Sequence, residues 1–140
     1  MDTNLPAKEF ETVLVVDDEP VVLNIICSVL EQAGFQVLRA STPHEALRIG
    51  SIHRDSIRLL VCDVVMPGQC GPMMADQFSL MHPETICLFI AGYPDTAIVE
   101  DQILGRGRAF LAKPFVPKTL VGKVREVLSG GPSLTMGAPA

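Results

Sequence analysis

Three carboxylates that follow short apolar runs are the residues of this chain best placed to do chemistry. Asp17 and Asp18 follow the apolar residues 13–16, and Asp63 follows residues 59–62. Runs of this kind form parallel strands buried on both faces, and such strands end together at the carboxyl edge, where open α/β folds bind ligands. Three acids that meet there repel one another unless a divalent cation joins them. Mg²⁺ suits such a site because it uses few carboxylates and keeps positions for water and phosphate oxygens, so we predict a magnesium-assisted phosphoryl site.

Length and composition are those of one globular domain. The chain has 140 residues, of which 48% are hydrophobic, and its mean hydropathy is +0.34. The net charge of −5 and the isoelectric point near 5.1 argue against direct contact with nucleic acid, because duplex binding draws on Lys and Arg. We therefore expect one folded unit that does not bind nucleic acid directly.

The cysteines and the N-terminus predict a cytoplasmic protein without a membrane segment. None of the four cysteines forms a C-x-x-C pair, and four are too few for a disulfide scaffold in a chain of this length. Residues 1–8 lack the apolar core of a signal peptide, and no apolar stretch reaches the roughly 20 residues that a membrane span needs.

Apolar runs alternate with helical patterns, which is typical of βα units on a parallel sheet. Thr42 is expected to cap a helix that starts at Pro43, with Glu45 completing a capping box, and Gly34 is expected to end the helix before it. Residues 1–10 and 130–140 are expected to be flexible ends. The predicted strands are 13–16, 36–40, 58–62, 85–91 and 109–112, and the predicted helices are 20–30, 43–51, 73–81, 96–104 and one that contains residues 120–128.

Three motifs give the chain a specific resemblance. They are Val-Val-Asp-Asp-Glu-Pro at 15–20, Asp-Val-Val-Met-Pro-Gly-x-x-Gly at 63–71 and Lys-Pro-Phe at 113–115. Together, in this order, they resemble the receiver domain of two-component response regulators over residues 11–129. The resemblance implies a doubly wound, flavodoxin-like five-stranded parallel sheet of order 2-1-3-4-5 and a cis Lys-Pro bond. The exit of the fourth strand, Ala-Gly-Tyr at 91–93, is most similar to receivers of hybrid histidine kinases.

The resemblance also implies a role for each site residue. Asp63 would accept a phosphoryl group from a phosphohistidine of a histidine kinase or phosphotransfer protein. Asp18 would bind Mg²⁺ directly, Asp17 would hold it largely through water, and the backbone carbonyl of Val65 would complete the protein ligands. Lys113 would pair with Asp63 and then with the phosphoryl group as a point charge. Signalling would run through contacts with a downstream protein or a fused kinase.

One position departs from the family pattern. Receivers usually carry Ser or Thr at the end of strand four, and this chain has Ala91 there. The missing hydroxyl removes a hydrogen bond to a charged acceptor, which is worth on the order of 1 to 3 kcal/mol and is comparable with typical allosteric coupling. The second switch position, usually aromatic, corresponds to Phe110, for which a partly buried core ring is an equally good interpretation.

Each assignment has a simpler structural alternative. Asp17 or Asp18 can cap the helix at Pro20, Asp63 can be a turn residue, and a lone Lys113 is most often a solvated charge. The three histidines, at 44, 53 and 82, lack ligand spacing, and we interpret them as surface residues.

Three functions follow from these patterns. The first is a phosphoacceptor in a phosphorelay, which is a signalling domain and not an enzyme. The second, motivated by Ala91, is a receiver-fold binding module that works without phosphorylation. The third is a phosphohydrolase like the haloacid dehalogenase group, which ranks last because those enzymes space two Asp residues by one, whereas here Glu19 holds the second position.

Overall fold

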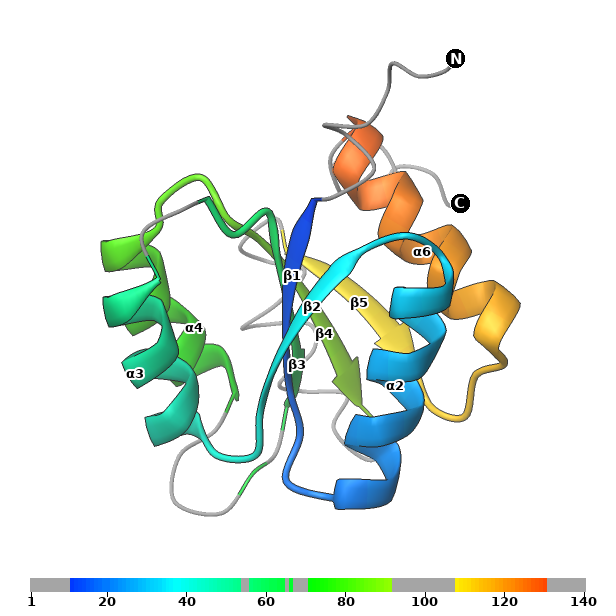
Figure 1. The fold of residues 1–140 in the computed structure, drawn as a ribbon, viewed down its shortest axis with the longest axis horizontal. Helices are drawn as coiled ribbons and strands as arrows, with labels where there is room; N and C mark the ends of the chain where they lie inside the picture. Colours follow the sequence, from blue (N-terminus) through cyan, green and yellow to red (C-terminus); the bar gives the residue numbers. More distant parts are fainter. Residues whose placement is uncertain (1–10, 54–55, 65, 67–70, 92–107, 131–140) are drawn as a thin grey trace.

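The chain folds around a five-stranded parallel sheet with the strand order β2-β1-β3-β4-β5 (Figure 1). The computed structural model describes residues 11–53, 56–64, 66, 71–91 and 108–130. The predicted doubly wound fold and its strand order are confirmed. The strands are β1 (Thr12–Val16), β2 (Gln36–Ala40), β3 (Leu59–Asp63), β4 (Ile86–Ala91) and β5 (Ala109–Ala112).

Helices cover both faces of the sheet. In Figure 1, α3 and α4 lie on one side of the strands and α2 and α6 lie on the other. The predicted helix at 96–104 falls outside the described residues. Within the described part of the chain, no helix is long and apolar enough to cross a membrane. The described helices are α2 (Pro20–Gln32), α3 (Pro43–Ile52), α4 (Gly71–Met81) and α6 (Pro117–Gly130).

Residues 13–16 of β1 and 59–62 of β3 are all apolar because the central strands supply two cores. On β1, Leu14 and Val16 belong to the core beneath α3 and α4, whereas Val13 and Val15 belong to the core beneath α2 and α6. All four side chains are at most 1% exposed. Alternation along a strand thus sends successive side chains into opposite layers, which explains why no polar residue interrupts the run.

Gly34 ends α2 and Thr42 caps the start of α3, as predicted, but the predicted capping box differs in one hydrogen bond. Gly34, which follows α2, has a φ of 103°, a value that favours glycine. The Thr42 hydroxyl accepts a hydrogen bond from the Glu45 backbone N–H at 3.0 Å. The Glu45 carboxylate, however, accepts from the backbone N–H of Ser41 at 2.9 Å and not from that of Thr42. The hydrogen bond that the Glu45 carboxylate returns to the backbone is therefore shifted by one residue relative to a standard capping box.

The interpretation of His82 as a surface residue is wrong. Its ring is stacked on Phe78 with centroids 5.1 Å apart, and the residue is 8% exposed. Nε2 lies 2.9 Å from the carbonyl oxygen of Gly50, so this nitrogen donates, because a carbonyl only accepts. The reason is position: His82 stands four residues after the buried Phe78 and so continues the inward side of α4.

The contact between α3 and α4 depends on a helical glycine. A Cβ built on Gly50 would lie 2.7 Å from Cε2 of the Phe78 ring and 3.1 Å from Cε of Met81. The Phe78 ring is fully buried and cannot move away easily. By contrast, a Cβ on Gly122 of α6 would meet nothing within 4 Å.

We predict opposite effects of the same substitution at these two glycines. Gly50→Ala should lower the free energy of unfolding by about 1 to 3 kcal/mol through overpacking. Gly122→Ala should raise it by about 0.5 to 1 kcal/mol, because alanine loses less backbone entropy in a helix. Urea unfolding of both variants tests this, and equal effects would contradict the packing described for α3 and α4.

Candidate functional site

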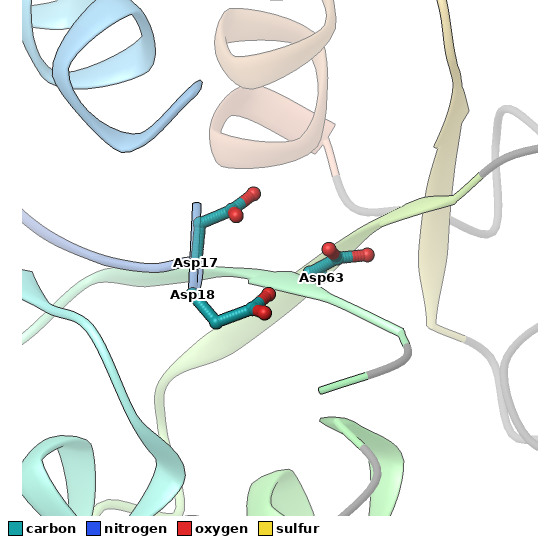
Figure 2. A group of neighbouring side chains, drawn as sticks. All are labelled: Asp17, Asp18 and Asp63. Atoms are coloured by element: carbon teal, nitrogen blue, oxygen red, sulfur yellow. The ribbon is translucent and has the colours of Figure 1, made fainter. Parts of the chain in front are cut away.

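Three carboxylates meet at the carboxyl edge of the sheet. β1 and β3 are neighbours, with Val16 paired to Cys62, so Asp17 and Asp63 leave the sheet at the same level. One carboxylate oxygen from each of Asp17, Asp18 and Asp63 lies within 4.8 Å of the other two. Figure 2 shows the carboxyl groups turned toward a common space, two from the β1 end and one from the β3 end. The predicted convergence of these acids is thus present.

Asp17 is the most buried member of the cluster. It is 1% exposed, and its Oδ1 accepts a hydrogen bond from the Glu19 backbone N–H at 2.9 Å. Burial raises the pKa of Asp17, and the charges of Asp63 and Asp18 add to this, against the opposing effects of the Glu19 N–H and of Lys113. Helix α2 starts after Glu19 without a side-chain cap, so neither acid caps that helix in the usual way.

Lys113 supplies a positive charge beside the acids. Its Nζ lies 3.4 Å from Oδ2 of Asp63, and the two side chains are 30% and 11% exposed. Its backbone N–H donates to the carbonyl of Ala91 at 2.9 Å, and the peptide bond to Pro114 is cis. Residues 17, 18, 63 and 113, far apart in sequence, therefore form one pocket.

Gly71 allows the start of α4 to approach Asp63 closely. A Cβ at this position would lie only 2.2 Å from the Asp63 carbonyl oxygen, and the Gly71 N–H donates to the Val64 carbonyl at 2.7 Å. The motif at 63–71 pointed to this glycine, but not to its contact. Gly71 holds the backbone beneath Asp63 and leaves no room for a side chain.

The two predicted switch positions lie on neighbouring strands. Ala91 is 1% exposed at the end of β4 and pairs with Ala112, whereas the partly buried ring of Phe110 packs against the core beneath α3 and α4. A buried methyl group at position 91 offers no hydrogen bond to the pocket. Val65, the predicted carbonyl ligand, lies outside the described residues.

The donor set of the pocket suits a hard divalent cation. All three side chains offer carboxylate oxygens, which are the ligands that Mg²⁺ prefers. Only Lys113 offsets their three negative charges among the groups described above, so the pocket has a net negative charge that a cation would neutralise.

The chain is similar to known receivers in sequence and in structure. A sequence profile of the response regulator receiver domain matches residues 13–125. The chain is 33% identical over 117 residues to the sensor kinase CckA of Brucella abortus, across 84% of this chain. It is 26% identical to the response regulator receiver protein CpdR of the same strain, across 83% of this chain and 95% of that protein.

Solved structures show the same likeness. The receiver domain of the hybrid histidine kinase CckA superposes with a TM-score of 0.71 and 31% identity, covering 84% of this chain and 99% of that one. A receiver domain protein from Clostridium thermocellum gives a TM-score of 0.78 and 27% identity, covering 85% and 94%. The chain spans only 12% of the length of the B. abortus kinase and 24% of the transcriptional regulator HoxA of Cupriavidus necator.

We predict that the raised pKa of Asp17 makes the metal-free protein less stable as pH rises. Between the ordinary pKa of 3.8 and the raised value, the folded state binds more protons than the unfolded state, so the free energy of unfolding falls with increasing pH. Asp17→Asn should therefore gain stability relative to the wild type as pH rises through this range, and keep that gain at higher pH. Urea unfolding in a chelating buffer from acidic to neutral pH tests this, and a constant difference between the two proteins would contradict it.

Proposed function

Because this chain belongs to the family of response regulator receiver domains, we propose that it accepts a phosphoryl group on Asp63 from a phosphohistidine. The support is one observation: the Asp63 carboxylate lies within 4.8 Å of two further carboxylates and 3.4 Å from the Lys113 ammonium. The family is one of signalling domains, so we expect the modified Asp63 to act through protein contacts.

In the proposed transfer, an oxygen of Asp63 forms a bond to phosphorus while the bond from phosphorus to the donor imidazole nitrogen breaks. The electron pair returns to that nitrogen, which then takes a proton from solvent. The Asp63 side chain is 11% exposed, enough for a donor to reach it from outside. Lys113 balances the charge of the arriving phosphoryl oxygens from one side.

Asp17 and Asp18 would hold Mg²⁺ together with Asp63. The metal, when bound, would offset negative charge on the phosphoryl oxygens. The hydrogen bond from the Glu19 N–H holds the Asp17 carboxylate in place before any ion arrives. This preorganisation reduces the ordering cost of binding.

Apolar side chains beside the pocket support a protein as the phosphoryl donor. Val21 and Ile25, one turn apart on α2, are 69% and 51% exposed, and Val116, three residues after Lys113, is 58% exposed. The donor would be a histidine kinase or a phosphotransfer protein. On the recipient side, we propose a downstream protein or a fused kinase that contacts β5 and α6.

We predict that acetyl phosphate and Mg²⁺ add one phosphoryl group to the wild type and none to Asp63→Asn. Removal of Mg²⁺ with a chelator should abolish the gain, because the repulsion among three carboxylates and the incoming phosphate is then uncompensated. Intact-protein mass spectrometry measures the change. Asp76→Asn, which alters an acid outside the pocket, is the matched control and should be modified like the wild type. Modification of Asp63→Asn to the same extent would refute Asp63 as the acceptor.

A second candidate function is a receiver-fold module that binds partners without phosphorylation. The buried methyl group of Ala91 favours it, because the side chain at position 91 cannot donate to a phosphoryl oxygen. In this case Asp63 could still be modified, but its modification would not reach the partner-binding face.

We predict that Ala91→Ser restores the coupling between phosphorylation of Asp63 and the conformation of Phe110 and α6. If the second function holds, acetyl phosphate should shift the amide resonances beside Asp63 in the wild type but leave Phe110 and α6 nearly unchanged. In Ala91→Ser the shifts should extend to both, with the modified conformation favoured at least about fivefold more, the lower end of typical allosteric coupling. Two-dimensional NMR before and after phosphorylation measures this. Shifts at Phe110 and α6 of the wild type as large as those of Ala91→Ser would refute a weakened switch and disfavour the second function.

A further inference from the structure

An open pocket lies at the amino edge of the sheet, at the opposite end from the three acids. In Figure 1 this is the end where β1 begins and where α2 and α6 finish. Its volume of about 920 Å³ falls in the range of roughly 300 to 1,000 Å³ that small-molecule sites occupy. We call it the arginine pocket, and its lining includes Glu11, Gly34, Phe35, Arg58, Arg125 and Leu128.

The arginine pocket exists because small residues stand where the two helices end. Ala33 and Gly34 follow α2, and Ser129 lies in the last turn of α6. A few residues earlier on the same helices, Leu30 and Val127 are fully buried in the core that both helices cover. The space between the helices is therefore filled along the core and opens at the edge, where the side chains become short.

The floor of the arginine pocket is fixed by the sheet. The Gln36 N–H donates to the Glu11 carbonyl at 3.0 Å, and the Arg58 N–H donates to the Thr12 carbonyl at 2.9 Å. These bonds hold the residues that precede β1 and β3 in place. A ligand would thus meet a preformed surface, which lowers the ordering cost of binding.

The arginine pocket carries local positive charge in a chain whose net charge is −5. Nε of Arg58 lies 3.1 Å from Oε2 of Glu11, and the two side chains are 36% and 26% exposed. Nη2 of Arg125 donates to the Ala33 carbonyl at 3.4 Å. Among the residues that the structure describes, no carboxylate pairs with Arg125. The described lining therefore holds two guanidinium groups and one carboxylate.

This lining selects a ligand with two parts. Each guanidinium has five N–H donors, and the contacts to Glu11, Leu128 and Ala33 occupy only some of them. The remaining donors suit carboxylate or phosphate oxygens, which the planar guanidinium binds in pairs. Beside these cations, the partly buried side chains of Phe35 and Leu128 offer apolar surface to the same space.

We propose that the arginine pocket binds a small organic anion, with a carboxylate or phosphate group carried on a planar apolar group. Arg58 directly precedes β3, and Asp63 ends that strand, so the two sites are roughly 17 Å apart along it. A ligand at the amino edge leaves the acidic pocket open. The inference is independent of phosphoryl transfer to Asp63.

Three probes that share a naphthalene ring test the proposal: naphthoate, naphthyl phosphate and the neutral naphthalenemethanol. Each is titrated to roughly 10 mM into isotope-labelled protein in a chelating buffer, and two-dimensional NMR follows the amides of Gly34, Phe35 and Ser129. We expect saturating shifts with at least one anion, with a dissociation constant on the order of 1 mM, and at least about fivefold weaker binding of the alcohol. The anion that binds more tightly identifies the charged group that the pocket prefers.

Arg125→Gln should weaken binding of the anion at least about threefold and leave the alcohol unaffected, because it removes one exposed charge beside the ligand. Lys118→Gln, in the first turn of α6, is the matched control. It removes the same charge from the other end of the helix and should bind like the wild type. Both side chains are exposed, so both variants should fold, and thermal unfolding checks that they do.

Absence of saturating shifts at the three amides with both anions overturns the proposal. So does an alcohol that binds as tightly as the anions, because the guanidinium groups then contribute nothing. Unchanged binding in Arg125→Gln would mean that Arg125 only closes the end of α2, and it also overturns the proposal. Equal losses in Lys118→Gln and Arg125→Gln would show attraction by overall charge and overturn the assignment to this pocket.

Discussion

The repulsion among three carboxylates within one pocket is the constraint on which the site depends. Asp17, Asp18 and Asp63 are held together by the pairing of β1 with β3, which costs free energy whenever all three are ionised. Burial of apolar side chains in the two cores offsets this electrostatic cost, because the strands that carry the acids are packed on both faces. Stability elsewhere in the fold thus maintains a pocket that is unfavourable by itself.

Charge balance around the pocket is uneven. Lys113 reaches Asp63 at 3.4 Å, longer than a strong charge-assisted hydrogen bond, and both side chains keep some exposure. Such a loose pair can be rearranged when a phosphoryl group arrives. Asp17, by contrast, is buried and held by a backbone N–H, so its position is set by the fold.

The two helical layers have different surfaces. The layer with α2 and α6 borders the pocket and exposes Val21 and Val116 beside it, whereas the layer with α4 exposes Met73 and Leu80. The acidic pocket and the arginine pocket stand at opposite edges of the sheet, so a ligand in one leaves the other open.

Local signals in the sequence, which are continuous apolar runs and helix-capping residues, predicted the strands and the acids that meet at the sheet edge, whereas the strand order followed from the resemblance to receiver domains. The predicted roles of Asp17, Asp18, Asp63 and Lys113 came from the resemblance. The contact between Lys113 and Asp63 joins residues 50 positions apart, and only the tertiary structure shows it. The tertiary structure also decided what no local pattern carries. His82 is buried because it continues the inward side of α4 against Gly50, and Gly71 is required because a backbone carbonyl lies where a side chain would be. Such contacts depend on which segments pack together, a property of the folded chain and not of any one stretch of it.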